Sequence, residues 1–340
     1  MKKEKIDFVI TWVDGNDPEW QKEKQKNLEK FLNSTVQSTK VGYSKNRYRD
    51  WGTLKYWFRG VEKNAPWVNK IYFVTCGQIP EWLDTKNKKL VIVNHKDYMP
   101  KKYLPTFNSE AIEVNLHRIK ELNENFVYFN DDLFITSKVI PEDFFQDGLP
   151  CDSAVLGVVP MLANAGYTDF NNTRILNKYF NKKEVIKKNP HQWLNLKYGK
   201  DLMKTLLLLP FGHFTGMTEY HICNSLRKST FKKLWELEPE VMETTSMNKF
   251  RANNDVNLWL LKNWEMLSGN FVPRKTNMGK SYCSKIDKNI CNEIKQGKYK
   301  IMCINDHVEI TEEEFVEQKQ MLIEAFETLF PEKSSFEREE

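Results

Sequence analysis

Short apolar runs, rich in β-branched and aromatic residues, alternate with helix-period segments through the first half of the chain. Four of these runs predict buried strands, at residues 6–13, 70–75, 89–94 and 126–129. Helices are expected between them, around Leu28, from 53 to 64 and from 109 to 122. Strands separated by helices of this length favour an α/β fold with a mostly parallel, helix-flanked sheet.

The rest of the chain is predicted to be more helical. Helical spacing of apolar residues covers 171–188, 228–235 and 256–267, and an acidic helix runs through Leu329. One more strand is expected at 299–304.

Acidic and amide residues follow three of the predicted strands. They are Asp14-Gly15 after the first strand, Asn130-Asp131-Asp132 after the fourth, and Asn305-Asp306 after the last. Ligands of parallel sheets bind at the carboxyl ends of strands. Paired carboxylates there can hold a divalent cation that bridges the phosphates of a nucleotide sugar. An acidic turn or a helix cap has the same letters, so the pairs alone leave both interpretations open.

Three other side chains are candidates for chemistry, each with a structural alternative. His221 could act as a general base near neutral pH, or it could be a structural histidine. Arg251 and Asp255 are four residues apart and are expected to face the same way at a helix start, as part of a site or as an ordinary ion pair. Arg49 could bind phosphate or form a salt bridge in a loop.

Charge and cysteine usage limit the class of protein. The 51 basic and 46 acidic residues give a net charge of +5, which is too slight to indicate nucleic-acid binding. Six cysteines without a CxxC pair indicate a reducing compartment. The N-terminus lacks the pattern of a signal peptide, and no apolar run approaches the length of a membrane span. A cytoplasmic location is therefore expected.

Basic residues cluster in one segment. Residues 174–200 contain eight of them against the single acidic Glu184, with aromatic residues interleaved. Such a surface could meet an anionic lipid or a pyrophosphate-linked acceptor at the inner face of the membrane. A solvated lysine face is favoured, because runs of this kind are usually just exposed.

Four blocks of the sequence resemble the signature regions of the Stealth family, which are hexose-1-phosphate transferases of capsular and other surface polysaccharides. That family is related to the lysosomal-enzyme N-acetylglucosamine-1-phosphotransferase. The first two regions resemble residues 6–20, 47–83, 104–119 and 126–134. The third resembles 214–240 and 248–260, and the fourth resembles 303–306 and 329–337.

The resemblance implies a reaction in which a hexose-1-phosphate, or its N-acetylhexosamine counterpart, moves from a UDP-sugar to a glycan hydroxyl with release of UMP. It implies acid–base roles for Asp132 and His221, a phosphate contact for Arg251, and Mg²⁺ or Mn²⁺ on Asp131 and Asp306. Contacts with the nucleotide or sugar are implied for Thr11, Trp12, Asp14, Gly15, Arg49, Asn108, Arg118 and Asn305. The expected acceptor is a polyprenyl-pyrophosphate-linked glycan.

The same resemblance implies a nucleotide-sugar-binding fold of the glycosyltransferase-A type with a helical insertion. The length of 340 residues allows one large or two ordinary domains. Because the candidate residues must meet in one site, a single composite domain is expected, with a core of 1–165 and 270–340. The insertion at 166–269 would carry His221 and Arg251. Two alternatives remain: a metal-dependent glycosyltransferase that releases UDP, and a non-catalytic carbohydrate-binding module.

Overall fold

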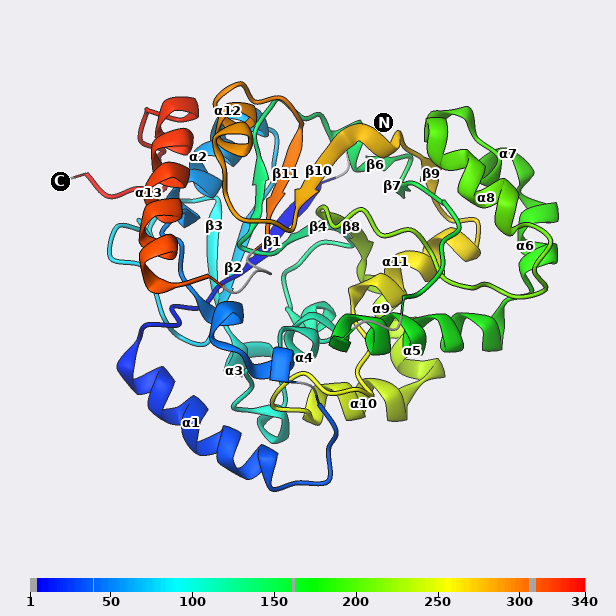
Figure 1. Ribbon diagram of the computed structural model, residues 1–340, viewed down its shortest axis with the longest axis horizontal. Coiled ribbons are helices and arrows are strands. Elements are labelled where there is room, and N and C mark those ends of the chain that lie inside the picture. The colour runs from blue at the N-terminus through cyan, green and yellow to red at the C-terminus, as the bar shows by residue number, and fades with distance from the viewer. Residues whose placement is uncertain (1–4, 39, 161–162, 306–309, 340) are drawn as a thin grey trace.

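A five-stranded sheet forms the centre of the computed structural model, which describes residues 5–38, 40–160, 163–305 and 310–339 (Figure 1). Its strands, in spatial order, are β3 (Leu90–Asn94), β2 (Ile71–Thr75), β1 (Asp7–Thr11), β4 (Asn125–Phe129) and β8 (Asn224–Arg227). The first four are parallel, and β8 pairs antiparallel with β4. The predicted mostly parallel sheet with flanking helices is confirmed.

The order of the strands creates a switch point between β1 and β4. The chain passes from β1 to β2 and β3 on one side, and then returns to place β4 on the other side of β1. Consecutive connections leave the sheet in opposite directions at that point, so a crevice opens at the carboxyl ends of the two strands. Thr11 and Asn130 lie at this edge.

Alternate residues of the central strands enter two apolar layers. Phe8 and Ile10 of β1 pack in one layer with Phe129, whereas Val9 packs in the other with Tyr128. All five side chains are buried. Because both faces of the strands are covered, they read as continuous apolar runs in the sequence.

A second sheet brings the C-terminal part of the chain to the end of β4. It consists of β10 (Gly279–Tyr282), β11 (Ile301–Ile304) and β5 (Leu133–Ile135). β11 runs antiparallel to β5, with Cys303 opposite Leu133. This register fixes where Asn305 meets Asp132. A third small sheet contains β6 (Phe145–Gln146), β7 (Leu149–Asp152) and β9 (Val272–Pro273).

Helices cover both faces of the central sheet and form a separate lobe (Figure 1). The α-helices are α1 (Pro18–Leu32), α2 (Leu54–Asn64), α3 (His95–Tyr98), α4 (Ser109–Glu113), α5 (Ala163–Tyr179), α6 (Lys182–Lys188), α7 (Pro190–Trp193), α8 (Leu202–Leu208), α9 (Lys228–Leu237), α10 (Pro239–Met247), α11 (Leu258–Leu267), α12 (Lys288–Lys295) and α13 (Glu312–Leu329). Among the described helices, none has the length and apolarity that a bilayer crossing requires.

Two predicted helices have other bounds in the structure. The helix expected at 109–122 ends at Glu113 and is followed by a 3-10 turn at Leu116–Arg118. The buried Asn115 side chain donates to the Ala111 carbonyl, and such side-chain bonds compete with helix continuation. The helix expected at 171–188 is split into α5 and α6, because Asn181 caps α6 with its side chain.

Candidate active site

A cavity of about 410 Å³ opens at the carboxyl ends of β1 and β4. Its lining comes from many separate parts of the sequence, which the fold brings to the switch point. The polar and aromatic residues in this lining include Thr11, Trp12, Arg47, Arg49, Asp50, Asn130, Asp131, Asp132, His221, Arg251 and Asn305.

Asp132 is the best-connected carboxylate of the cavity. Its carbonyl accepts from the Ile304 amide at 2.8 Å, and its Oδ2 accepts from the Asn305 side chain at 3.0 Å and from the Cys303 thiol at 3.6 Å. Its Oδ1 is buried and has no hydrogen-bond partner among the described residues. Potential ligand atoms of Asp132, His221 and Cys303 lie within 4.8 Å of one another.

Cys303 supports Asp132 as a neutral thiol. Burial raises the pKa of this thiol well above its ordinary value, and the negative charge of Asp132 acts in the same direction. A protonated thiol is a hydrogen-bond donor, whereas metal binding needs the thiolate. Cys303 therefore helps to hold Oδ2 in place and leaves Oδ1 for another partner.

Asp131 stands beside two other carboxylates. Its side chain is exposed and lines the cavity, where neighbouring protein takes away part of its solvent. This partial removal from solvent, with the charges of Asp132 and Asp50, raises the pKa of Asp131 to about 7. We call Asp50, Asp131 and Asp132 the carboxylate wall of the cavity. Their charges favour a positively charged ligand.

His221 enters the cavity on a braced loop. Its φ of 47° lies in the left-handed region that few side chains adopt. Upstream, the Thr218 amide donates to the Val155 carbonyl at 2.8 Å. Glu219 forms an ion pair with the buried Lys262 and accepts from the Asn263 side chain at 3.0 Å. These contacts fix the loop against α11 and the segment that follows β7, and they hold His221 beside Asp132.

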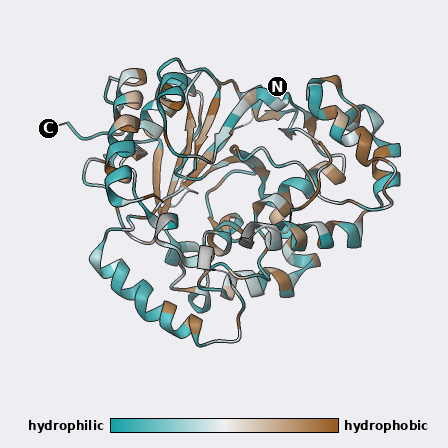
Figure 2. Ribbon diagram, in the orientation of Figure 1, coloured by the Kyte–Doolittle hydropathy of each residue, from teal (hydrophilic) through white to brown (hydrophobic). Residues whose placement is uncertain are grey.

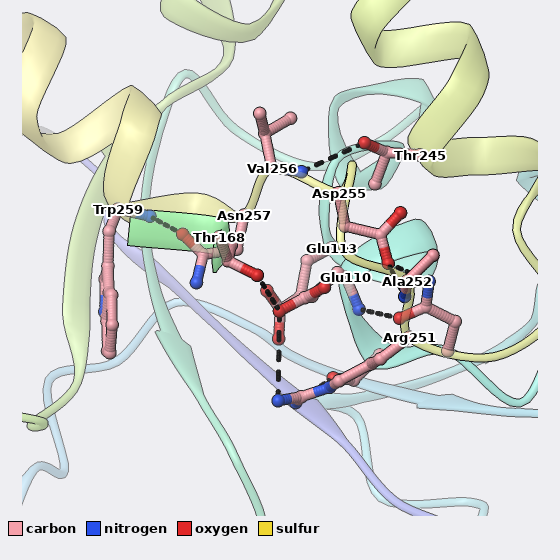
Figure 3. A network of polar contacts seen from close by, with 12 residues as sticks. Glu110, Glu113, Thr168, Thr245, Arg251, Ala252, Asp255, Val256, Asn257 and Trp259 are labelled. Carbon is pink, nitrogen blue, oxygen red and sulfur yellow. Dashed lines mark hydrogen bonds and ion pairs between the residues drawn. The ribbon is translucent and has the colours of Figure 1, made fainter. Parts of the chain in front are cut away.

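Arg251 lies on a loop and not at a helix start, so the prediction for Arg251 and Asp255 is wrong. Asp255 is fully buried and accepts from the Ala252 amide at 2.7 Å, which folds the loop on itself (Figure 3). It also accepts from the side chains of Asn108 and Asn248. Asp255 therefore shapes the loop and does not pair with Arg251.

The loop aims the Arg251 guanidinium at the cavity. Its Nη2 donates to the Ser109 hydroxyl at 2.7 Å. Its Nη1 lies 3.8 Å from a Glu110 oxygen (Figure 3). Arg47, which our sequence analysis did not select, is close enough to interact electrostatically with Arg251. Burial, and then the charge of Arg251, lower the pKa of Arg47 to about 10, so it stays charged at neutral pH. Two guanidinium groups on one wall favour an anionic ligand.

Comparisons with known proteins identify the family. Models of three Stealth conserved regions match this chain: region 1 at residues 4–31, region 2 at 47–151 and region 4 at 292–340. The capsular polysaccharide phosphotransferase WcwK of Streptococcus pneumoniae is 47% identical over 98% of both chains. The chain belongs to the Stealth family.

Other Stealth proteins give the same result. The exopolysaccharide phosphotransferase cps2G of Lactiplantibacillus plantarum is 40% identical over 98% of this chain and 96% of its own. The receptor polysaccharide phosphotransferase WefC of Streptococcus oralis is 42% identical over 98% and 99%. This Stealth protein is accordingly a transferase. The crystal structure of mouse xyloside xylosyltransferase 1 covers 91% of this chain and 100% of its own, with a TM-score of 0.37 and 10% identity, which is too weak a likeness to inform the chemistry.

Several residues implied by the Stealth resemblance lie outside the cavity lining. Asn108 is buried, where it caps α4 and holds Asp255. Arg118 stacks on Trp235 at 4.5 Å. Asp14 closes a turn by accepting from the Asn16 amide at 2.9 Å.

Gly15 and Asp306 are two further positions that the Stealth resemblance implies. A Cβ at Gly15 would lie 1.7 Å from the Tyr48 carbonyl oxygen, so glycine is needed for the close approach of these two segments. Asp306 falls outside the described residues, and its metal role stays a prediction.

We expect Glu113→Gln to stabilise this Stealth protein at alkaline pH. Burial raises the pKa of Glu113 from 4.5 to about 7. The folded state therefore holds this proton more tightly than the unfolded state, and wild-type stability falls as pH rises from about 4.5 to 7. Glutamine does not titrate, so the variant should gain up to about 3 kcal/mol in free energy of unfolding at pH 8.

Denaturant unfolding at pH 5 and pH 8 measures this gain. The exposed Glu317→Gln on α13 is the matched control, and we expect it to behave as wild type at both pH values. An equal stability difference for Glu113→Gln at the two pH values would contradict the raised pKa.

Proposed function

We propose that this Stealth enzyme transfers hexose-1-phosphate, or N-acetylhexosamine-1-phosphate, from a UDP-sugar to a hydroxyl of a glycan acceptor. The product is a phosphodiester in a capsular or other surface polysaccharide, and UMP leaves. The main support is the cavity at the switch point, where a carboxylate wall, His221 and two arginines face one space. The relatives named as polysaccharide phosphotransferases support the same reaction.

The proposed reaction forms one bond and breaks one. The acceptor oxygen attacks the β-phosphorus of the donor, and the bond from this phosphorus to the UMP oxygen breaks. The acceptor proton must go to a base, and a second group must face the leaving oxygen. Asp132 and His221 lie side by side and fit these two roles.

The other residues of the cavity would bind the donor. Arg251 and Arg47 would neutralise phosphate oxygens as charge develops in the transition state. Trp12, whose ring stacks on Phe73 beneath it, offers a fixed apolar surface to the uracil or the sugar.

A divalent cation fits the carboxylate wall. Asp131 lines the cavity and is an oxygen donor of the kind that Mg²⁺ or Mn²⁺ prefers, while the buried, unpartnered Oδ1 of Asp132 beside it stays free for the acceptor proton. Bound there, the cation would add positive charge at the phosphate oxygens of the donor. The neutral Cys303 thiol argues against a thiolate site of the zinc type.

The nucleotide product tests the proposed reaction. A panel of UDP-sugars is incubated with a lipid-linked or synthetic glycan acceptor, and phosphorus NMR detects the product. We expect UMP together with a phosphodiester signal. Release of UDP would indicate a conventional glycosyltransferase, and saccharide binding without consumption of any donor would indicate a binding module.

We expect excess chelator to abolish UMP release, and Mg²⁺ or Mn²⁺ to restore it. The three carboxylates would otherwise repel the donor phosphates. Initial rates before and after dialysis against chelator measure the effect, and circular dichroism controls for unfolding. Full activity in excess chelator would rule out the metal role.

We place this reaction in the cytoplasm, at the inner face of the membrane. The proposed acceptor is a glycan carried on polyprenyl pyrophosphate, so the enzyme must work where lipid and water meet. The lobe formed by α6, α7 and α8 (the α6–α8 lobe, residues 182–211) exposes apolar and lysine side chains, so it is the part of the described chain that suits this position.

A further inference from the structure

Large apolar side chains are exposed to solvent in and around α8. Leu196 is 88% exposed and Leu207 is 70% exposed. We define the α8 patch as Leu194, Leu196, Met203, Leu206, Leu207 and Phe211, all of which are exposed. This patch lies in the α6–α8 lobe, at the end of the long axis opposite α13 (Figure 1), and Figure 2 shows hydrophobic and hydrophilic residues mixed there. Exposed apolar groups gathered in one place mark an interaction surface.

The geometry of α8 separates an inner from an outer face. Thr205 is fully buried, and its hydroxyl accepts from the Leu156 amide at 3.1 Å. Met203 and Leu207 are two positions before and after it, about 200° away around the helix, and so face outward. Leu202 and Leu208 pack against the core beneath. The inner face of α8 is thus packed against the rest of the protein. The outer apolar face does not contribute to the core of the described chain.

Exposed lysines occur in the same stretch of chain as the α8 patch. They are Lys183, Lys187, Lys188, Lys197, Lys200 and Lys204. Between residues 181 and 213 the acidic residues are Glu184 and Asp201, and Asp201 pairs with Lys204 at 3.0 Å. The surface therefore combines apolar groups with excess positive charge, which is the composition of a segment that lies in the interface of an anionic bilayer.

The structure shows which lysines of the basic 174–200 segment are available to contact a membrane. Lys178 pairs with Glu238, and Lys182 is buried and donates to the Leu208 carbonyl. The first part of the basic 174–200 segment is therefore engaged within the protein. The exposed lysines without an ion pair among the described residues are Lys183, Lys187, Lys188, Lys197 and Lys200, in the same lobe as the apolar side chains.

We propose that the α8 patch docks on an anionic lipid membrane, with Met203, Leu207 and Phe211 entering the headgroup boundary and the lysines contacting acidic headgroups. A second copy of this chain fits less well, because it would bring like charges together. Docking would hold the enzyme beside a lipid-borne acceptor. This purpose rests on the proposed function, whereas the docking itself does not. The 209–220 segment leads directly from α8 to His221, so the docked helix and the site share one stretch of chain.

Vesicle flotation tests the proposal with the full-length protein. One set of vesicles is phosphatidylcholine, and the other contains about 30% phosphatidylglycerol, which gives the negative surface that lysines recognise. We expect at least roughly tenfold stronger binding to the anionic vesicles, weakened by high salt. Equal or absent binding to both vesicles would overturn the proposal.

The variant Met203→Glu/Leu207→Glu distinguishes binding through the α8 patch from non-specific binding to vesicles. It should lower binding to anionic vesicles by roughly tenfold or more, because charge replaces the inserted apolar groups. The matched control is Val316→Glu, since Val316 is 64% exposed on α13 at the other end of the molecule. This control should bind as wild type. If both variants bind alike, or if the double variant only converts a dimer to a monomer in sedimentation velocity, the proposal is wrong.

The activity assay is kept independent of the vesicle assay. With a water-soluble acceptor, the double variant should release UMP at the wild-type rate, because its substitutions lie on the α6–α8 lobe surface. Lost binding with retained UMP release supports docking. Vesicle binding by a protein that releases no UMP would contradict the proposed reaction and leave the docking proposal standing.

Discussion

Asp132→Asn should lower the rate of UMP release by roughly two orders of magnitude or more and leave the fold intact. Asparagine has the same shape and can still accept from the Asn305 side chain and the Ile304 amide. It removes the negative charge at Oδ1, the buried oxygen that no described residue satisfies. The loss should therefore appear in turnover, measured as UMP released at saturating donor, with an unchanged melting temperature.

Asp147→Asn is the matched control for this substitution. Asp147 is exposed in a turn with a φ of 50°, which asparagine also tolerates. It should retain wild-type turnover. Near-wild-type UMP release by Asp132→Asn would remove Asp132 from the proposed chemistry, whereas a lowered melting temperature with restored activity at low temperature would reduce its role to folding.

The strands and the location of the site could be predicted from the sequence because the same residues determine both. A strand buried on both faces reads as an apolar run, and the acidic residues that end β1 and β4 stand out against it. Since parallel strands end at one edge, the Asn130-Asp131-Asp132 turn had to lie there.

The partners of these residues could not be predicted, because they depend on contacts between distant segments. The support of Asp132 by Cys303 follows from the register of β11 against β5. Nothing in the local sequence of Cys303 distinguishes it from the other buried thiols.

Local sequence also could not separate binding arginines from structural ones. Arg118 ends a 3-10 turn and Arg251 lies on a loop, but of the two only Arg251 lines the cavity. Asp255 decides this by folding the loop, and its partners Asn108 and Asn248 come from two separate segments. Arg47 was missed, although its position two residues before Arg49 was an available signal.

His221→Asn and His221→Gly should each lower UMP release by roughly two orders of magnitude or more, through loss of the imidazole as proton acceptor or donor. Two variants are needed because His221 has a left-handed φ of 47°. Glycine adopts this conformation without strain, and asparagine tolerates it better than alanine does. Neither substitution should therefore disturb the loop that Glu219 and Lys262 brace.

The effect of the backbone conformation can then be separated from that of the imidazole by measuring turnover and UDP-sugar affinity for both variants. If His221 matters only for the shape of the loop, His221→Gly should keep most of its turnover, which would contradict an acid–base role. If the imidazole carries the chemistry, both variants should bind the UDP-sugar with near-wild-type affinity while turnover is lost. His213→Ala, an exposed histidine in the same connection to β8, should release UMP at the wild-type rate. A comparable loss in that control would show that the connection as a whole, and not His221, limits the reaction.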